Sequence, residues 1–234
     1  MSHTPTSSIH AATSSPQSTP TAGECTEGMR PLLASTYFGP IQWYQKLFRG
    51  EHCLIERHEH FVKQSYRNRC IIATTNGPQS LSIPIEQYEG TKCAMKDIRV
   101  SDHGNWRHLH WNALCSAYGE SPFFEYLADD LHPFFERRWD FLFDFNLEIT
   151  YKVCELLDFE PHLTLTDAYL TPTDAARQGI ADYRDIIRPK RALPDPAFTP
   201  KPYHQVYEAK WGFQPNLSIL DLLFNTGREG VLFL

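Results

Sequence analysis

Residues 32–56 place the strongest constraint on the fold of this chain, because they read as a strand, a helix and a second strand in close succession. Residues 32–36 form a short apolar run, and residues 41–48 carry apolar side chains at helical spacing after Pro40. Residues 52–56 form the second apolar run. Two strands joined by a helix pair in parallel, with the helix as the crossover. The opening therefore predicts part of a parallel sheet.

A hairpin and a helical section are expected next. Residues 69–75 and 80–85 are strand-like runs on either side of residues 76–78, Asn-Gly-Pro, which are typical of a hairpin turn. Pro78 predicts that this turn is longer than two residues, and residues 97–100 predict a further short strand. Helices are predicted over residues 106–118, 122–135 and 139–157, and from Ser218 to Gly227.

We therefore expect an α/β or α+β domain over residues 29–234, with a small mixed sheet, a helical middle section and a C-terminal helix. Residues 1–28 are rich in Ser, Thr and Pro, which predicts a disordered extension, and Met29 is a candidate native start. Residues 171–202 contain six prolines and the basic run Arg-Pro-Lys-Arg at 188–191. They predict a long loop that is either functional or disordered.

Composition limits the classes of partner. The net charge of −6 argues against nucleic-acid binding, which needs a broad basic face. No apolar run approaches the ~20 residues of a membrane span. The six cysteines are scattered and include no C-x-x-C pair, which favours free thiols and a cytoplasmic location. The sequence assigns no cofactor and no oligomeric state.

Three cations within seven residues form the best candidate for a binding site. If this segment is extended, Lys63, Arg67 and Arg69 share one face, and Tyr66 and Asn68 occupy the other. Two arginines at i and i+2 can hold a phosphate or a carboxylate through bidentate hydrogen bonds. The alternative is a solvated strand edge, where charges prevent pairing with another chain. Composition alone leaves both interpretations open.

Nearby side chains offer acid–base or nucleophilic chemistry. His60 is a candidate general base because histidine titrates near neutral pH, and His58 would lie on the same strand face. Cys70 could be a thiolate nucleophile beside the arginines, although a cysteine that opens an apolar strand is usually a core residue. No H-E-x-x-H or Cys–His spacing is present, so we expect no metal site. The lack of G-x-G-x-x-G, P-loop and G-x-S-x-G motifs argues against dehydrogenases, P-loop NTPases and α/β-hydrolases.

The C-terminal run carries a second group of polar candidates. Asn216, Ser218 and Asp221 could present polar groups into a cleft at a helix N-terminus, which attracts anions. The alternative is a well-capped helix, because Ser218 and Asp221 have capping-box spacing with Asp in place of Glu or Gln.

Taken together, three stretches resemble the WbqC-like protein family, most closely the branch found in Bacteroidetes. They are residues 36–40 with Tyr44, residues 63–69 followed by 81–85, and Gln205 with residues 215–225 and Gly227. Their order and spacing fit from about residue 31 to residue 234. The chain departs from the family pattern at Arg57 and His60, where Asp and Gln are frequent, and at Tyr66, where Trp is common.

The resemblance implies a role in O-antigen, lipopolysaccharide or other surface polysaccharide synthesis, including aminoacyl (glycyl) or acyl transfer to a sugar. The leading hypothesis is thus a transferase for an anionic substrate, either a nucleotide sugar or a carrier-linked acyl or aminoacyl group. The basic segment, with Tyr66, would bind the anion, and His60 or Glu56 would deprotonate the sugar. Polar side chains would orient the acceptor: Asn68, Asn216, Ser218 and Asp221.

Two other hypotheses stay open. A non-catalytic scaffold of a polysaccharide pathway would dock its partner on the aromatic helices and the Pro-rich loop. A closed pocket that joins the basic segment to residues 216–221 would favour the transferase over this scaffold. A nucleotidyl-transfer fold is a third idea, and it rests only on the strand–turn–helix opening.

Overall fold

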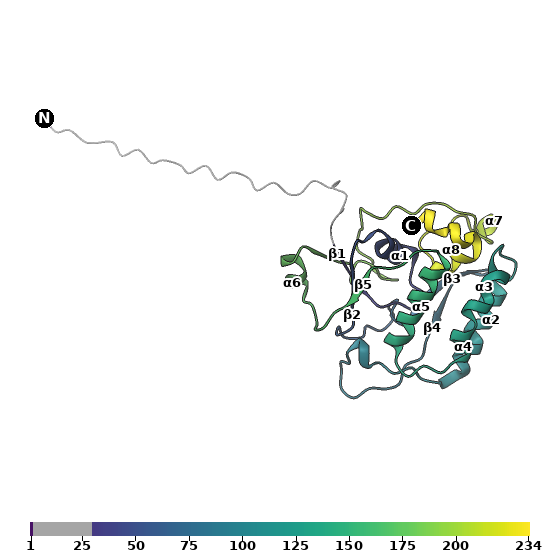
Figure 1. Ribbon diagram of the computed structural model, residues 1–234, viewed down its shortest axis with the longest axis horizontal. Coiled ribbons are helices and arrows are strands. Elements are labelled where there is room, and N and C mark those ends of the chain that lie inside the picture. The colour runs from purple at the N-terminus through teal and green to yellow at the C-terminus, as the bar shows by residue number, and fades with distance from the viewer. Residues whose placement is uncertain (2–29) are drawn as a thin grey trace.

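Four parallel strands form a sheet in the order β5-β2-β1-β6. The structure is a computed structural model that describes Met1 and residues 30–234. The strands are β1 (Arg30–Ala34), β2 (Cys53–Glu56), β5 (Leu163–Leu165) and β6 (Ile180–Asp182). The chain runs outward from β1 through β2 to β5, and then returns to the other side of β1 as β6 (Figure 1). The predicted parallel pair of the opening segment is therefore confirmed.

Both faces of the central strands β1 and β2 are buried, and the alternation of their side chains explains how. Leu32 pairs with Leu54, and both face a small apolar cluster with Ala175 of α6 (Pro172–Arg177). Leu33 pairs with Ile55, and both belong to the large core on the opposite face. Near-continuous apolar strands are expected where a parallel sheet is covered on both sides.

The predicted hairpin is confirmed as β3 (Arg69–Thr74) and β4 (Gly77–Ser82), but its turn is shorter than expected. Thr74 pairs with Gly77, so only two residues connect the strands. Gly77 has φ 97°, a left-handed conformation that glycine adopts without strain. Pro78 pairs with Ala73, whose N–H donates to the Tyr118 hydroxyl (3.1 Å) and not to β4, so the missing Pro N–H removes no ladder bond.

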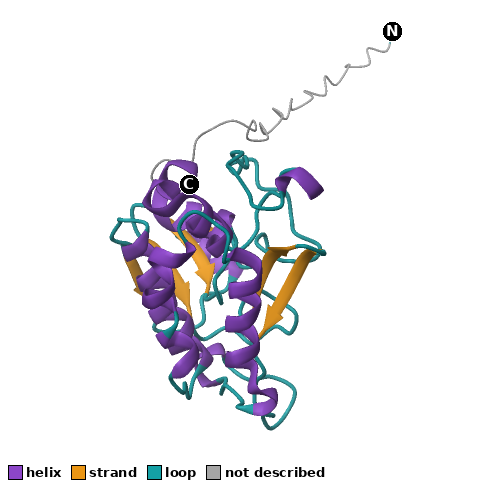
Figure 2. Cartoon of the chain, turned by 90° about the vertical axis from the view of Figure 1, so that its right-hand side faces the viewer, coloured by secondary structure: helices purple, strands orange, loops and turns teal. Residues whose placement is uncertain are grey.

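The helices gather beside the strands (Figures 1 and 2), with α5 between the parallel sheet and the layer of α2, α3 and α4. The remaining bounds are α1 (Ile41–Arg49), α2 (Trp106–Tyr118), α3 (Phe124–Leu131), α4 (Pro133–Glu136), α5 (Leu142–Leu156), α7 (Glu208–Trp211) and α8 (Ile219–Thr226), with 3-10 turns at Met95–Asp97, His103–Asn105 and Gly227–Phe233. The molecule is a mixed α/β single domain, as expected. None of the helices between residues 30 and 234 combines the length and apolar content that a bilayer span requires.

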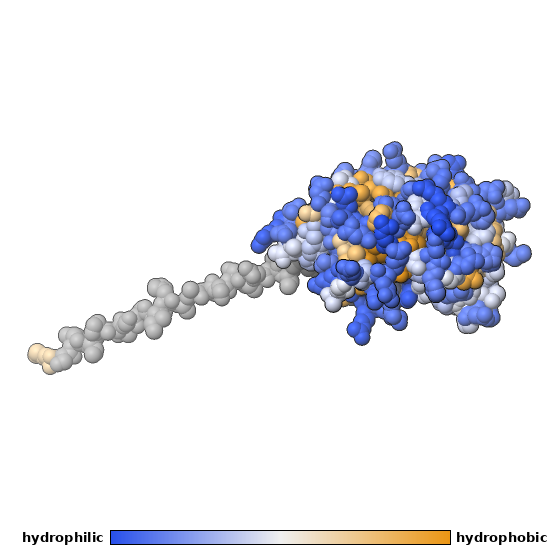
Figure 3. All heavy atoms as spheres, turned by 90° about the horizontal axis from the view of Figure 1, so that it is seen from below, coloured by the Kyte–Doolittle hydropathy of each residue, from blue (hydrophilic) through white to orange (hydrophobic). Residues whose placement is uncertain are grey.

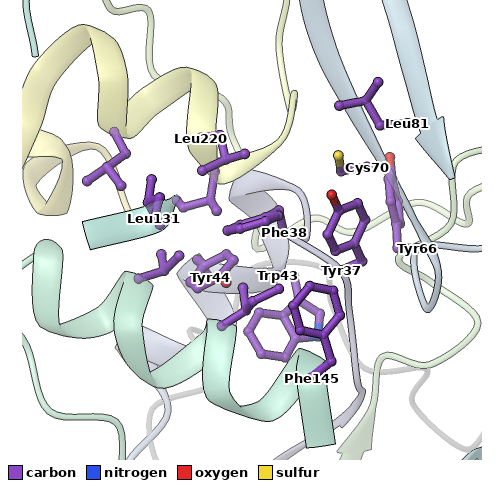
Figure 4. Close-up of a cluster of buried hydrophobic side chains, with 14 of the residues drawn as sticks. Tyr37, Phe38, Trp43, Tyr44, Tyr66, Cys70, Leu81, Leu131, Phe145 and Leu220 are labelled. Carbon is purple, nitrogen blue, oxygen red and sulfur yellow. The ribbon is translucent and has the colours of Figure 1, made fainter. Parts of the chain in front are cut away.

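Aromatic side chains fill the space between α1, α5 and the hairpin (Figure 4). Tyr37, Phe38, Trp43 and Tyr44 are almost fully buried, and the ring centroids of Tyr37 and Phe145 lie 5.9 Å apart. The face seen in Figure 3 is mostly hydrophilic, with hydrophobic atoms gathered in its middle.

Three expectations for secondary structure need correction. Residues 97–100 form no strand, because Asp97 ends a 3-10 turn and Arg99 and Val100 make only isolated bridges, to Phe141 and Ile85. The helix expected over residues 122–135 is divided into α3 and α4 at Pro133, whose ring cannot continue a helix from the preceding turn.

The third correction concerns residues 171–202, which were expected to form one long loop. It contains α6 and β6, and only the part after Asp182 lacks regular structure. The structure therefore turns the first third of this segment into part of the sheet and its cover. The expectations for the N-terminal extension and for Met29 as the start fall on residues 2–29, which lie outside the described part of the chain.

Candidate functional site

The carboxyl end of β2 holds a fully buried carboxylate, Glu56. One of its oxygens accepts hydrogen bonds from the main-chain N–H of His58 (2.8 Å) and the hydroxyl of Thr166 (2.7 Å). The other accepts from the main-chain N–H of Leu170 (2.9 Å) and from the Arg184 guanidinium (3.3 Å). Because these donors follow β2, β5 and β6, Glu56 ties together the loops at the carboxyl edge of the sheet. It has no exposed surface through which to meet a substrate.

Arg184 joins β6 to the same cluster. It is 5% exposed, and it donates to both oxygens of Asp182 (2.9 and 2.5 Å) and to the main-chain oxygen of Leu170 (2.9 Å). Its guanidinium carbon lies 5.2 Å from the centroid of the Tyr169 ring. Burial alone would lower the pKa of Arg184, but the hydrogen bonds and the charge of Asp182 raise it by more. The pKa is therefore raised overall, and the side chain stays charged.

A second buried ion pair lies on the loop after β2. The guanidinium of Arg67 donates to both oxygens of Glu59 at 2.7 and 2.6 Å. The two side chains are 3% and 8% exposed. Burial raises the pKa of the Glu59 carboxyl, and the facing Arg67 lowers it again without cancelling the rise. The charges of Glu56 and Arg184 also act on Glu59, so the two pairs form one buried network. Burying four ions is costly in folding energy, which makes this network a candidate for function.

The shared face expected for the cations of residues 63–69 is wrong. The segment forms successive turns rather than a strand, and Gln64 has a left-handed φ of 58°. Arg67 therefore turns inward to Glu59, whereas Lys63 is exposed. Arg69 lies on β3 and donates from Nε to the Ser82 hydroxyl on β4 (3.0 Å). The three cations thus have three different surroundings.

The other two polar candidates of this segment, Tyr66 and Asn68, have structural surroundings. Tyr66 is buried, and burial raises the pKa of its hydroxyl to about 12. Its main-chain oxygen accepts from the N–H of Tyr37 (2.9 Å). The side-chain amide of Asn68 donates to the main-chain oxygen of Ile83 (2.8 Å). Both residues connect the turns to neighbouring elements.

The two histidines and the cysteine are also separated. His60 is exposed and bridges to Ala94. His58 is half-buried, and its Nε2 accepts from the Nε of Arg57 (3.3 Å). Cys70 is buried beside the Tyr37 and Tyr66 side chains (Figure 4), and burial raises the pKa of its thiol. These surroundings correspond to the core alternative for Cys70.

Asn216 and Ser218 occupy the N-terminus of α1. The Asn216 amide oxygen accepts from the N–H of Gln42 (2.9 Å), and the Leu217 main-chain oxygen accepts from the N–H of Ile41 (3.0 Å). The Ser218 hydroxyl donates to the Phe38 main-chain oxygen (2.8 Å) and also caps α8. In nucleotide-binding sheets the first helix offers these N–H groups to phosphate. Here the protein itself uses them, which argues against the nucleotidyl-transfer idea.

Asp221 belongs to a separate buried cluster. It accepts from the hydroxyls of Tyr118 (2.9 Å) and Tyr203 (2.5 Å) and from the amide of Gln205 (2.9 Å). Burial raises the pKa of its carboxyl, and these hydrogen bonds partly lower it. Its carboxylate therefore joins distant segments instead of completing the capping box expected with Ser218.

A cavity of about 300 Å³ opens between two segments that adjoin the buried ion network in the chain. Residues 62–65 form one wall and residues 188–191 form the other. The first wall lies between Glu59 and Arg67, and the second follows Arg184 in the chain. The pocket thus joins the basic segment to the Pro-rich segment. Residues 216–221 do not line this cavity, so it is not the pocket that would join the basic segment to the C-terminal motif.

Sequence reasoning missed Glu59, Asp182 and Arg184. Arg184 was hidden because β6 has only three residues, which is too short for a readable alternation. Glu59 offered one available signal, since an acid eight residues before Arg67 is a potential ion-pair partner. In the described part of the chain, no group of three His, Cys, Asp or Glu side chains is arranged to hold a metal ion.

The comparisons with known proteins identify the family. The model of the WbqC-like protein family matches residues 35–188, more than half of the chain. This range contains the whole buried ion network but ends before residues 190 and 191 and before the C-terminal motif. The chain is also similar to the uncharacterized protein Rv1507c of Mycobacterium tuberculosis, at 25% identity over 189 residues, which cover 72% of this chain and 81% of that protein. No solved structure matches the chain. The chain belongs to the WbqC-like protein family.

Proposed function

We propose that the protein is a cytoplasmic transferase that moves an aminoacyl (glycyl) or acyl group to a sugar in the synthesis of surface polysaccharide. Its substrate carries an anionic group, which binds in the cavity between residues 62–65 and 188–191. The observation that carries the proposal is this basic cavity, whose two walls adjoin in the chain a buried network of charged side chains at the carboxyl edge of a parallel sheet.

The position of the cavity supports a binding role. One wall belongs to the loop after β2 and the other to the segment after β6, and these strands lie on either side of β1. Open parallel sheets bind their ligands outside the carboxyl ends of the strands, and both β2 and β6 end at this edge. The pair of Glu59 with Arg67 closes the loop that carries the first wall, and the pair of Glu56 with Arg184 ties the start of the second segment to β2.

His60 is the proposed general base. It is exposed and lies two residues before the cavity wall, whereas all four hydrogen bonds to Glu56 come from the protein itself. In the proposed step, the sugar amine or hydroxyl attacks the acyl carbonyl carbon, and His60 takes the proton of the attacking group. The new C–N or C–O bond replaces the bond to the donor's leaving atom, which departs with the electron pair.

The pocket with residues 216–221 that would have favoured the transferase over the scaffold is not found among the described residues, so the choice between the two rests on the Pro-rich segment. In a scaffold this segment would need to be available to a partner, but Asp195 fastens it to α1. The Asp195 carboxylate accepts from Lys46 (2.8 Å) and from Gln42 (2.9 Å), and the Lys46 and Asp195 side chains are buried.

A ligand screen followed by a transfer assay tests the proposal. Thermal shift is measured with nucleotide sugars, coenzyme A esters, acyl carriers and amino acids, because a ligand of the native state raises the melting temperature. Ligands that bind are then combined in pairs, and the acylated sugar is detected by mass spectrometry. We expect His60→Gln to abolish product formation while it retains the thermal shift.

The matched control is His103→Gln, an exposed histidine on the turn before α2, which should retain both readouts. If the His60→Gln variant forms as much acylated sugar as the unchanged protein, His60 is not the general base. Binding without any transferred product, across all donor and acceptor pairs, would contradict the transferase and favour a binding protein.

A further inference from the structure

We propose that the cavity between residues 62–65 and 188–191 is a pyrophosphate-binding site, and that the Pro-rich segment supplies most of its cations. This inference rests on the proposed function, since it names the anionic group of the substrate. It adds Arg188, Lys190 and Arg191 to the site, next to Lys63.

Both walls of the cavity are held in place by the protein. In the first wall, the Ser65 hydroxyl donates to the main-chain oxygen of Val62 (2.6 Å) and closes the turn that presents Lys63. The second wall is fastened before it by Arg184 to Glu56 and after it by Asp195 to α1. A cavity with two anchored walls can bind an anion without first ordering a loop, which lowers the entropic cost of binding.

The charges of the lining are of one sign. Lys63, Arg188, Lys190 and Arg191 line the cavity, and none of its described lining residues is acidic. Arg188 is paired with Asp185 just outside the cavity. Within residues 30–234, no acidic side chain lies within ion-pair distance of the other three. Like charges gathered without partners repel one another, so a bound polyanion would relieve a cost already present in the fold.

Two further observations point to a ligand. The Nε of Arg188 is buried and has no hydrogen-bond partner in the described chain, so this donor is available to an acceptor that binds in the cavity. Gln64 and Arg191, one from each wall, have left-handed φ angles of 58° and 54°. Strained backbone of this kind gathers at ligand sites.

The number of cations and their place on two facing walls together favour one ligand class. A carboxylate or a phosphodiester brings a single charge, which leaves at least two of the free cations without a counter-charge. A pyrophosphate linkage carries a charge on each phosphoryl group, and its oxygens can accept from both walls at once. Nucleotide sugars and coenzyme A both contain this linkage. We therefore infer that the site binds the pyrophosphate linkage itself, whether a nucleotide sugar or coenzyme A supplies it.

Isothermal titration calorimetry of the full chain with sodium pyrophosphate tests the inference, with orthophosphate and acetate as weaker anions. We expect pyrophosphate to bind most tightly, and higher NaCl to weaken it. Lys63→Ala and Arg191→Ala should each weaken binding about tenfold, the loss expected for one charged hydrogen bond. The control is Lys92→Ala, which removes an exposed lysine outside the cavity and should leave binding unchanged.

The outcomes separate this inference from the proposed function. Pyrophosphate binding that the two cavity variants do not change, or acetate binding as tight as that of pyrophosphate, would overturn the site. Titration with UDP-glucose and with coenzyme A then shows which source binds. If pyrophosphate binds as expected but no transfer occurs, only the proposed function fails. If transfer occurs with a donor and an acceptor that both lack pyrophosphate, only this inference fails.

Discussion

The ion pair between Arg67 and Glu59 makes a quantitative prediction about folding. Arg67→Met removes the cation but keeps much of the volume of the side chain, so the Glu59 carboxylate stays buried without its partner. Because the two side chains are 3% and 8% exposed, solvent does not replace the lost bonds. Breaking one side of a buried pair costs about 3–5 kcal/mol, so we expect the free energy of unfolding to fall by that amount at pH 8.

The loss should depend on pH in a defined direction. Burial already raises the pKa of Glu59, and the removal of Arg67 takes away the main opposing effect. The folded variant then binds a proton more strongly than the unfolded chain does. Its stability therefore decreases as the pH rises above the unfolded pKa, by about 1.4 kcal/mol for each unit up to the folded pKa. The variant should be less impaired at pH 5 than at pH 8.

Urea unfolding followed by circular dichroism measures both effects. The double variant Glu59→Leu/Arg67→Met removes both charges together, and replacing a buried pair by apolar side chains is often close to neutral. We expect it to be more stable than either single variant. A double variant whose loss equals the sum of the two single losses, or a pH-independent loss in Arg67→Met, would refute the reasoning.

Three further predictions concern residues outside the cavity. Burial lowers the pKa of His110 to about 4, so as the pH falls the unfolded chain takes up this proton before the folded chain does. The free energy of unfolding should therefore fall by about 3 kcal/mol between pH 6.5 and pH 4. His110→Gln should remove this part of the pH dependence in urea titrations, and an unchanged pH dependence would contradict the prediction. Gly39→Ala places a Cβ 2.4 Å from the Thr36 hydroxyl oxygen and should cost about 1–3 kcal/mol, which an unshifted urea midpoint would contradict. Asp221→Asn turns an amide N–H toward a hydroxyl that now donates to the carboxylate, so the free energy of unfolding should fall by about 1–3 kcal/mol in thermal unfolding. A variant that keeps full stability but loses ligand binding would instead indicate a functional role.

Much of the local structure could be read from the chain. The β1–α1–β2 unit follows from two apolar runs and a helical period, and α2 spans the residues that its pattern predicts. The hairpin was readable from Asn76 and Gly77, because a turn signal and two β-rich runs act over a few residues. Only local periodicity and turn chemistry are needed for these elements.

The candidate site was only half readable. The basic segment was recognised, but its geometry was not, because the left-handed turn at Gln64 directs Lys63 outward and allows Arg67 to reach Glu59. Arg188 stood out as part of a basic run in an expected loop, with no sign that it faces Lys63. The two segments are more than a hundred residues apart, and no local pattern links them.

The sequence by itself thus determined the elements, the family motifs and the presence of a basic segment, since each depends on residues close together in the chain. Tertiary structure decided which cations become buried partners and which line a cavity. The bond from Arg184 to Glu56 spans 128 residues, and it forms only because β6 returns to pair beside β1. Three-residue strands have little preference of their own, so their place, and with it the site, is fixed by the packing of the whole sheet.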